Sequence, residues 1–213
     1  MTISVKICGL SDPAAVACAV DGGAAMVGFV FFPASPRHLT PEEAALLTGS
    51  VPDGVLRVGL TVDADDALLA DIAATAGIDM LQLHGQETPE RVQDIRERFG
   101  LPVMKMLPIA AADDVIAAAD YEDVADRFLF DAKPPADATR PGGNAEAFDW
   151  SLLKDNSAQK PWMLAGGLTA ENLAIAVKTS GAMAVDVSSG VEDAPGVKSL
   201  DKIRAFLAAA NSL

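Results

Sequence analysis

Two residues that could act as a base and an acid each follow a short apolar run. Cys8 follows Val5-Lys6-Ile7, and Asp131 follows Phe128-Leu129-Phe130. A thiolate removes a proton and a protonated carboxyl donates one, so the two could act together on a small substrate. Each also has a plainer interpretation: Cys8 as a small buried hydrophobe, and Asp131 as the ion-pair partner of Lys133. The fold decides whether they meet.

Short runs of β-branched and other apolar residues alternate with alanine-rich segments along the chain. The strand candidates are residues 3–7, 25–31, 56–62, 80–83, 103–107, 127–130, 162–165 and 184–187. Capping residues predict helix starts at Asp12, Thr40, Thr88 and, more weakly, Thr169. Strands that alternate with helices predict a parallel sheet.

Eight strand–helix units favour a closed barrel over an open sheet. In 213 residues each unit averages about 27 residues, and such barrels begin at about 200 residues. An open doubly wound sheet usually has fewer strands, and the first strand–helix turn lacks the dinucleotide-binding glycine pattern. We therefore predict an α/β fold, a (β/α)8 TIM barrel forming a single domain over residues 1–213. The weakest unit is the sixth, with a Pro/Gly-rich loop at 134–144 and a short helical stretch near 149–153.

The alternation of side chains along the strands predicts which of them point into the barrel. One face of each strand is apolar and suits contact with helices, whereas the other is partly polar. We expect six polar side chains to point inward. They should pair near the mouth of the barrel, because an unpaired buried charge is costly. They are Lys6, Arg57, Gln82, Lys105, Asp131 and Asp186.

Composition excludes several classes of function. The formal charge of −14 argues against binding to nucleic acid, although backbone amides could still hold a small anion. No apolar run is long enough for a membrane span, and the N-terminus lacks a signal-peptide pattern. Two cysteines make no disulfide framework, so a cytoplasmic location is expected. Two histidines without paired ligand spacing predict no metal site.

Glycine-containing loops follow the last two predicted strands. Gly166 and Gly167 follow the seventh, and Ser189 and Gly190 follow the eighth, just after Asp186. Glycine allows backbone N–H groups to approach a phosphate closely. Loops after strands seven and eight are the usual phosphate site of this barrel class. The alternative is that these glycines only form tight turns.

Two further residues are candidates for ligand contacts. Arg37 lies in a proline-rich loop after the second strand, where its guanidinium could bind a carboxylate through two parallel hydrogen bonds or remain solvated. His84 follows the fourth strand and could contact a ligand or cap its loop. The sequence shows no Ser/His/Asp pattern and no P-loop.

Six motifs in order along the chain resemble the phosphoribosylanthranilate isomerase family of tryptophan biosynthesis. They are Lys6-Ile7-Cys8-Gly9-Leu10, Phe32-Pro33-Ala34-Ser35-Pro36-Arg37, Leu81-Gln82-Leu83-His84-Gly85, Phe130-Asp131, Leu164-Ala165-Gly166-Gly167-Leu168 and Asp186-Val187-Ser188-Ser189-Gly190-Val191-Glu192. The segment from Gly142-Gly143-Asn144 to Trp150 is also similar. Ala145 and His38 depart from residues that are common in the family.

The resemblance implies an aldose–ketose isomerase, an intramolecular oxidoreductase that acts on a phosphosugar without a cofactor. It implies that Asp131 protonates the sugar ring oxygen and that Cys8, as thiolate, removes the proton from C2. Arg37 would hold the anthranilate carboxylate, and Gly166, Gly167, Ser189 and Gly190 would hold the phosphate. His84 and Asp186 would contact the substrate, although Asp186 could instead pair with a cation. The expected assembly is a monomer or homodimer, with no nucleic-acid or membrane partner.

Two other functions are compatible with a phosphate-binding barrel. A related phosphosugar enzyme, such as indole-3-glycerol-phosphate synthase or a ribulose-phosphate epimerase, would use a Lys/Glu set or a metal site, and neither pattern is evident. Lys105 keeps a lysine-based reaction open. A non-catalytic phosphate-binding barrel would not need both Cys8 and Asp131.

Overall fold

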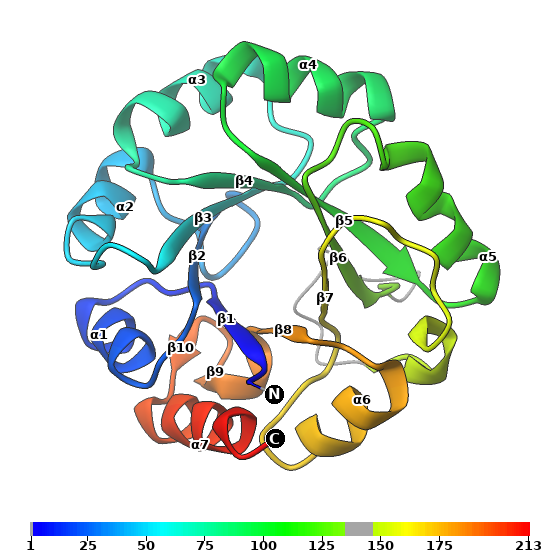
Figure 1. Cartoon of the computed structure of the whole chain (residues 1–213). Helices are drawn as coiled ribbons and strands as arrows, with labels where there is room; N and C mark the ends of the chain where they lie inside the picture. The colour runs from blue at the N-terminus through cyan, green and yellow to red at the C-terminus, as the bar shows by residue number, and fades with distance from the viewer. Residues whose placement is uncertain (1, 135–146) are drawn as a thin grey trace.

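Eight parallel strands close into a barrel in the computed structural model, which describes residues 2–134 and 147–213 (Figure 1). The strands are β1 (Ser4–Cys8), β2 (Met26–Phe31), β3 (Leu56–Thr61), β4 (Met80–Leu83), β5 (Val103–Ile109), β6 (Arg127–Ala132), β7 (Trp162–Leu164) and β8 (Ala184–Val187). Each strand pairs with the next along the chain, and β1 pairs with β8 to close the ring. The predicted (β/α)8 barrel is confirmed.

Helices surround the barrel on the outside (Figure 1). They are α1 (Pro13–Asp21), α2 (Pro41–Thr48), α3 (Asp66–Thr75), α4 (Pro89–Phe99), α5 (Ala112–Ile116), α6 (Leu173–Ser180) and α7 (Leu200–Asn211). The short helical stretch predicted near 149–153 is a 3-10 turn, Trp150–Leu153. A small antiparallel pair, β9 (Glu192–Ala194) and β10 (Val197–Lys198), precedes α7. The predicted Pro/Gly-rich loop at 134–144 lies, beyond Pro134, outside the described residues.

Three of the four predicted helix starts are confirmed. The side chains of Asp12, Thr40 and Thr88 each accept a hydrogen bond from a backbone N–H in the first turn of the helix that follows. The start predicted at Thr169 is wrong, because α6 begins at Leu173. The intervening loop is held by Asn172, which accepts from the Thr169 N–H at 2.8 Å and donates to the Gly167 carbonyl at 2.8 Å.

The barrel interior and the layer between strands and helices form separate apolar groups. The lower interior is filled by Met26, Val58, Met80, Met104, Met106, Leu129, Met163, Ala165 and Ala184. Methionine is unbranched and flexible, so it fills the irregular space inside a small barrel. A smaller group near the mouth contains Cys8, Val30 and Leu60. The reactive side chains therefore lie above an apolar floor.

Four of the six polar residues predicted to point inward do so: Lys6, Gln82, Asp131 and Asp186. The prediction is wrong for Arg57 and Lys105. Arg57 stands level with Val27, and Lys105 with Leu83, and both of these apolar neighbours pack against the helices. Both faces of a barrel strand are buried, so alternation by itself does not identify the inner one.

Replacing Met104 with alanine should destabilise the fold, since its side chain is fully buried in the interior. We expect the free energy of unfolding, measured by urea titration, to fall by about 2–5 kcal/mol because a cavity forms. Leu46→Ala is the control, because Leu46 is 82% exposed on α2, and surface changes usually stay within about 0.5 kcal/mol. Equal losses in the two variants would contradict the assignment of Met104 to the core.

Candidate active site

Cys8 ends β1 with its thiol on the inner face of the barrel, two residues beyond Lys6 on the same face. Both side chains meet above Gly28 of β2. A Cβ at Gly28 would lie 2.9 Å from Cys8 Sγ and 3.1 Å from Lys6 Nζ. The absence of a side chain at this glycine therefore leaves the space in which the thiol and the ammonium come together.

Lys6 is completely buried, and its Nζ lies 2.9 Å from Asp186 Oδ1 on β8. Burial alone would lower the pKa of Lys6, but Asp186 and Cys8 together raise it above its ordinary value. These two neighbours therefore favour the ammonium form of Lys6. Burial raises the pKa of the Cys8 thiol, and the nearby Lys6 ammonium opposes that effect. Asp186 acts in the other direction, because its negative charge raises the pKa of Cys8.

Asp131 is buried near the end of β6, with its two carboxyl oxygens in different surroundings. Oδ1 accepts a hydrogen bond from the Ala132 N–H at 2.8 Å, and Oδ2 lies 3.5 Å from His84 Nε2. Lys133, the ion-pair partner considered from sequence, forms no ion pair with Asp131 in the described part of the chain. Gly166 packs against Asp131, since a Cβ there would lie 3.3 Å from Oδ1. The carboxyl thus borders the loop after β7.

The loops after β7 and β8 are packed directly against each other. A Cβ at Gly190 would lie 1.9 Å from the carbonyl oxygen of Leu168, so only glycine fits there without a backbone shift. Gly166 and Gly167 adopt φ values of +87° and +63°, a region that favours glycine. The two loops that contain the residues predicted to hold a phosphate therefore lie side by side: Gly166 and Gly167 in one, Ser189 and Gly190 in the other.

Arg37 is buried, so the solvated interpretation of this residue is wrong. Its guanidinium donates two hydrogen bonds to Glu192, from Nε to Oε1 at 2.6 Å and from Nη2 to Oε2 at 2.8 Å. Gly9 makes room for the arginine, because a Cβ at Gly9 would lie 2.4 Å from Arg37 Cδ. The arginine therefore crosses the end of β1, with one edge of its guanidinium occupied by a carboxylate of the same chain.

Lys198 completes this charged cluster. It donates to Glu192 Oε1 at 2.7 Å and to the Ser188 carbonyl at 2.9 Å. Burial would raise the pKa of Glu192, but Arg37 and Lys198 more than offset it and hold the pKa below its ordinary value. Burial lowers the pKa of Lys198 despite the nearby Glu192. The cluster joins the loop after β2 to the loop after β8.

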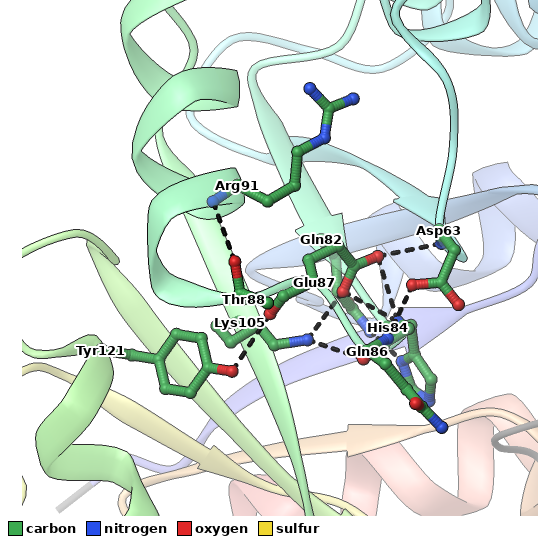
Figure 2. Close-up of polar contacts among 10 residues, drawn as sticks. Asp63, Gln82, His84, Gln86, Glu87, Thr88, Arg91, Lys105 and Tyr121 are labelled. Carbon is green, nitrogen blue, oxygen red and sulfur yellow. Dashed lines mark hydrogen bonds and ion pairs between the residues drawn. The ribbon is translucent and has the colours of Figure 1, made fainter.

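A second polar cluster fixes the loop after β4, as Figure 2 shows. Glu87 accepts from the N–H of Gly85 at 3.0 Å, from the N–H of Asp63 at 3.0 Å and from Lys105 Nζ at 2.7 Å. Lys105 also donates to the Gly85 carbonyl at 2.7 Å, and Tyr121 donates to the Glu87 carbonyl at 3.0 Å. These contacts hold the backbone that immediately follows His84.

Several charged residues around the candidate site were missed by the sequence analysis. Glu87, Glu192 and Lys198 were not predicted as site residues, although each is buried and ion-paired. Glu192 was visible only as the last residue of a motif, and Lys198 lies in a short segment with no chemical pattern. A charged residue that directly follows a predicted site loop, as Glu87 does, is the signal that could have been used.

Neither a metal-binding group nor a membrane-spanning helix is found in the part of the chain that the structure describes. Across residues 2–134 and 147–213, no three His, Cys, Asp or Glu side chains gather to form a metal site. No helix within these ranges is long and apolar enough to cross a bilayer.

Known proteins resemble this chain over nearly its whole length. The family model described as "PRAI: N-(5'phosphoribosyl)anthranilate (PRA) isomerase" matches residues 5–209. The N-(5'-phosphoribosyl)anthranilate isomerase of Paramagnetospirillum magneticum is 58% identical over 210 residues, covering 99% of this chain and 98% of the relative.

Solved structures agree with this assignment. A crystal structure of phosphoribosyl anthranilate isomerase in complex with reduced 1-(o-carboxyphenylamino)-1-deoxyribulose 5-phosphate is 34% identical, with a TM-score of 0.85, covering 99% of this chain and 100% of that one. Monomers of the dimeric enzyme from Thermotoga maritima give the same identity, coverage and TM-score. This chain belongs to the N-(5'-phosphoribosyl)anthranilate isomerase family.

Proposed function

We propose that this chain catalyses the Amadori rearrangement of N-(5-phosphoribosyl)anthranilate to 1-(2-carboxyphenylamino)-1-deoxyribulose 5-phosphate in tryptophan biosynthesis. The reaction converts an aldose derivative into a ketose, so it is an intramolecular oxidoreduction. It takes place in the cytoplasm, on a small phosphosugar, in a monomer or homodimer. Family membership supports this activity, and the dimeric relative supports the second form of assembly.

One observation carries the proposal. A cysteine and an aspartate lie at the carboxyl ends of two barrel strands, with their side chains on the inner face, and each is beside a group suited to its role. Cys8 lies beside the buried Lys6 ammonium, which favours its thiolate. Asp131 lies beside His84 and the glycine loop after β7. Active sites of this barrel class lie at the carboxyl ends of the strands.

The substrate would be held at its two anionic ends. The loops containing Gly166, Gly167, Ser189 and Gly190 would bind the phosphate through backbone N–H groups. The guanidinium of Arg37 would bind the anthranilate carboxylate from the side of Nη1, because Glu192 accepts from Nε and Nη2. His84 and Asp186 would border the sugar. Two fixed ends orient the reacting carbons between the acid and the base.

Proton transfer would then proceed in two steps. Asp131 donates its proton to the furanose ring oxygen, the bond between C1 and that oxygen breaks, and the anilino nitrogen supplies the electron pair that forms an iminium. The Cys8 thiolate next removes the proton from C2, and the electrons of that C–H bond move to form the enamine. Because C2 carries a hydroxyl group, this enamine is also an enol, and its tautomerisation gives the ketone. The substrate nitrogen serves as the electron sink, so the scheme requires no cofactor.

The purified protein should consume phosphoribosylanthranilate, with loss of the substrate's fluorescence. Cys8→Ser should lower kcat by about 10²–10⁴-fold, because an alcohol is a far poorer base than a thiolate, and should change KM little. Cys18→Ser is the matched control, since Cys18 lies on α1 with its thiol directed to the Leu200 carbonyl. A Cys8→Ser enzyme with nearly full activity would remove Cys8 as the base. An inactive wild-type protein would contradict the proposed function.

Asp131→Asn should also lower kcat by about 10²–10⁴-fold, since an amide has no acidic proton for the ring oxygen. Asp79→Asn is the control, because Asp79 is paired with Arg57 on the helix-facing side of the barrel. We expect this control to keep its kcat. Comparable turnover in Asp131→Asn and wild type would assign the acid role to another group.

Removing the Lys6 charge should move the ionisation of Cys8 to higher pH. In a Cys18→Ala background, the rate of iodoacetamide alkylation against pH reports the Cys8 thiolate. Lys6→Met with Asp186→Leu avoids leaving a buried charge unpaired. Lys6 lowers the pKa of Cys8 more strongly than Asp186 raises it, so loss of both should shift the alkylation profile upward. A profile that is unchanged or shifted downward would contradict activation of the thiol by Lys6.

A further inference from the structure

Within residues 2–134 and 147–213, two buried polar atoms near the proposed acid have no hydrogen-bond partner: Gln82 Oε1 and His84 Nε2. Gln82 lies on the inner face of β4 and is completely buried, and His84 lies two residues later, just beyond the end of the strand. An unpaired buried polar atom is costly and calls for an explanation. For His84 Nε2, the explanation lies in the contacts of its ring with Gln82 and with Asp131.

The side-chain amide of Gln82 contacts one of the two ring nitrogens of His84. Gln82 Nε2 lies 3.0 Å from His84 Nδ1. An amide nitrogen only donates, so in this arrangement Nδ1 must accept and therefore carries no hydrogen. A neutral imidazole has one N–H group, which is then on Nε2.

The Nε2–H group of His84 faces the carboxyl of Asp131. Nε2 lies 3.5 Å from Asp131 Oδ2, while the other oxygen, Oδ1, already accepts from the Ala132 N–H. At 3.5 Å this contact is longer than a normal hydrogen bond. Catalytic hydrogen bonds are frequently long without substrate and shorten in the substrate complex. Oδ2 is therefore the oxygen that His84 reaches when the site is occupied.

The backbone that follows His84 is fixed by contacts with Glu87 and Lys105. Glu87 accepts a hydrogen bond from the N–H of Gly85, and Lys105 donates one to the Gly85 carbonyl. A Cβ at Gly85 would lie 2.3 Å from Asp63 Oδ1, which shows how closely the neighbouring loop approaches. These contacts fix the backbone next to His84, whereas the hydrogen bond with Gln82 orients the ring.

We infer that Gln82 is a positioning residue that selects the Nε2–H tautomer of His84, so that His84 donates a hydrogen bond to Asp131 as that acid loses its proton. The inference rests on the proposed function. The proton moves from Asp131 to the ring oxygen, and negative charge develops on the carboxylate. The Nε2–H group stabilises this charge without transferring its own proton. In the opposite tautomer, the Nε2 lone pair would compete with the substrate for the proton of Asp131.

The tautomer is measured directly by NMR of protein with 15N-labelled histidine. The chain has only two histidines, so in His38→Asn both ring-nitrogen signals come from His84. We expect Nδ1 to be unprotonated and Nε2 protonated. Gln82→Glu replaces the donor with an acceptor and should transfer protonation to Nδ1. A ring already protonated at Nδ1 with Gln82 in place, or no change in Gln82→Glu, would overturn the inference.

Steady-state kinetics test the catalytic consequence. Gln82→Glu should lower kcat by about 10–100-fold, the value of one hydrogen bond to a charged group, and leave KM within about threefold. Gln82→Met keeps the shape without the donor and should lose less, since it imposes neither tautomer. It also provides a second variant if Gln82→Glu fails to fold. An inactive wild type would overturn the proposed function together with this catalytic role. An active wild type with unchanged kcat in Gln82→Glu would overturn the inference alone.

Discussion

The buried ion pair between Lys6 and Asp186 joins the first and the last strand of the barrel. The two side chains meet at 2.9 Å on the inner face, where β1 and β8 pair to close the ring. Loss of one partner would leave an unpaired charge in the interior, which typically costs about 3–5 kcal/mol. The same ammonium lies beside the Cys8 thiol. One contact therefore links the two strands that close the barrel and also affects the ionisation of the proposed base.

The proposed base and the proposed acid lie in two different polar clusters at the mouth of the barrel, above an interior rich in methionine. One lies on the side of β1 and β8, where Cys8 is close to the pair of Lys6 and Asp186. The other lies on the side of β4 to β6, where His84 faces Asp131. Glu87 holds the loop that follows His84 (Figure 2). A substrate that spans the mouth would meet the base from one cluster and the acid from the other, so neither group needs to serve both roles.

The fold and the ends of the barrel strands could be predicted from sequence because they depend on local patterns. Cys8 follows its apolar run at the end of β1, and Asp131 comes one residue before the end of β6. The inner face of β3 and β5 could not be predicted, because both faces of these strands are buried and only strand register distinguishes them. The pairing of Arg37 with Glu192, 155 residues away, was also invisible. Such contacts depend on which loops the closed barrel brings together.

The most direct test of the proposed chemistry is a crystal structure of this chain with the reduced product analogue bound in the relative of known structure. Cys8 Sγ should then lie about 3–3.5 Å from the carbon that loses its proton, the distance expected of reacting atoms. The carboxyl of Asp131 should lie beside the oxygen that closes the furanose ring in the substrate. A complex in which the analogue fills the mouth with C2 directed away from Cys8, or with Asp131 remote from that oxygen, would contradict the assignment of base and acid.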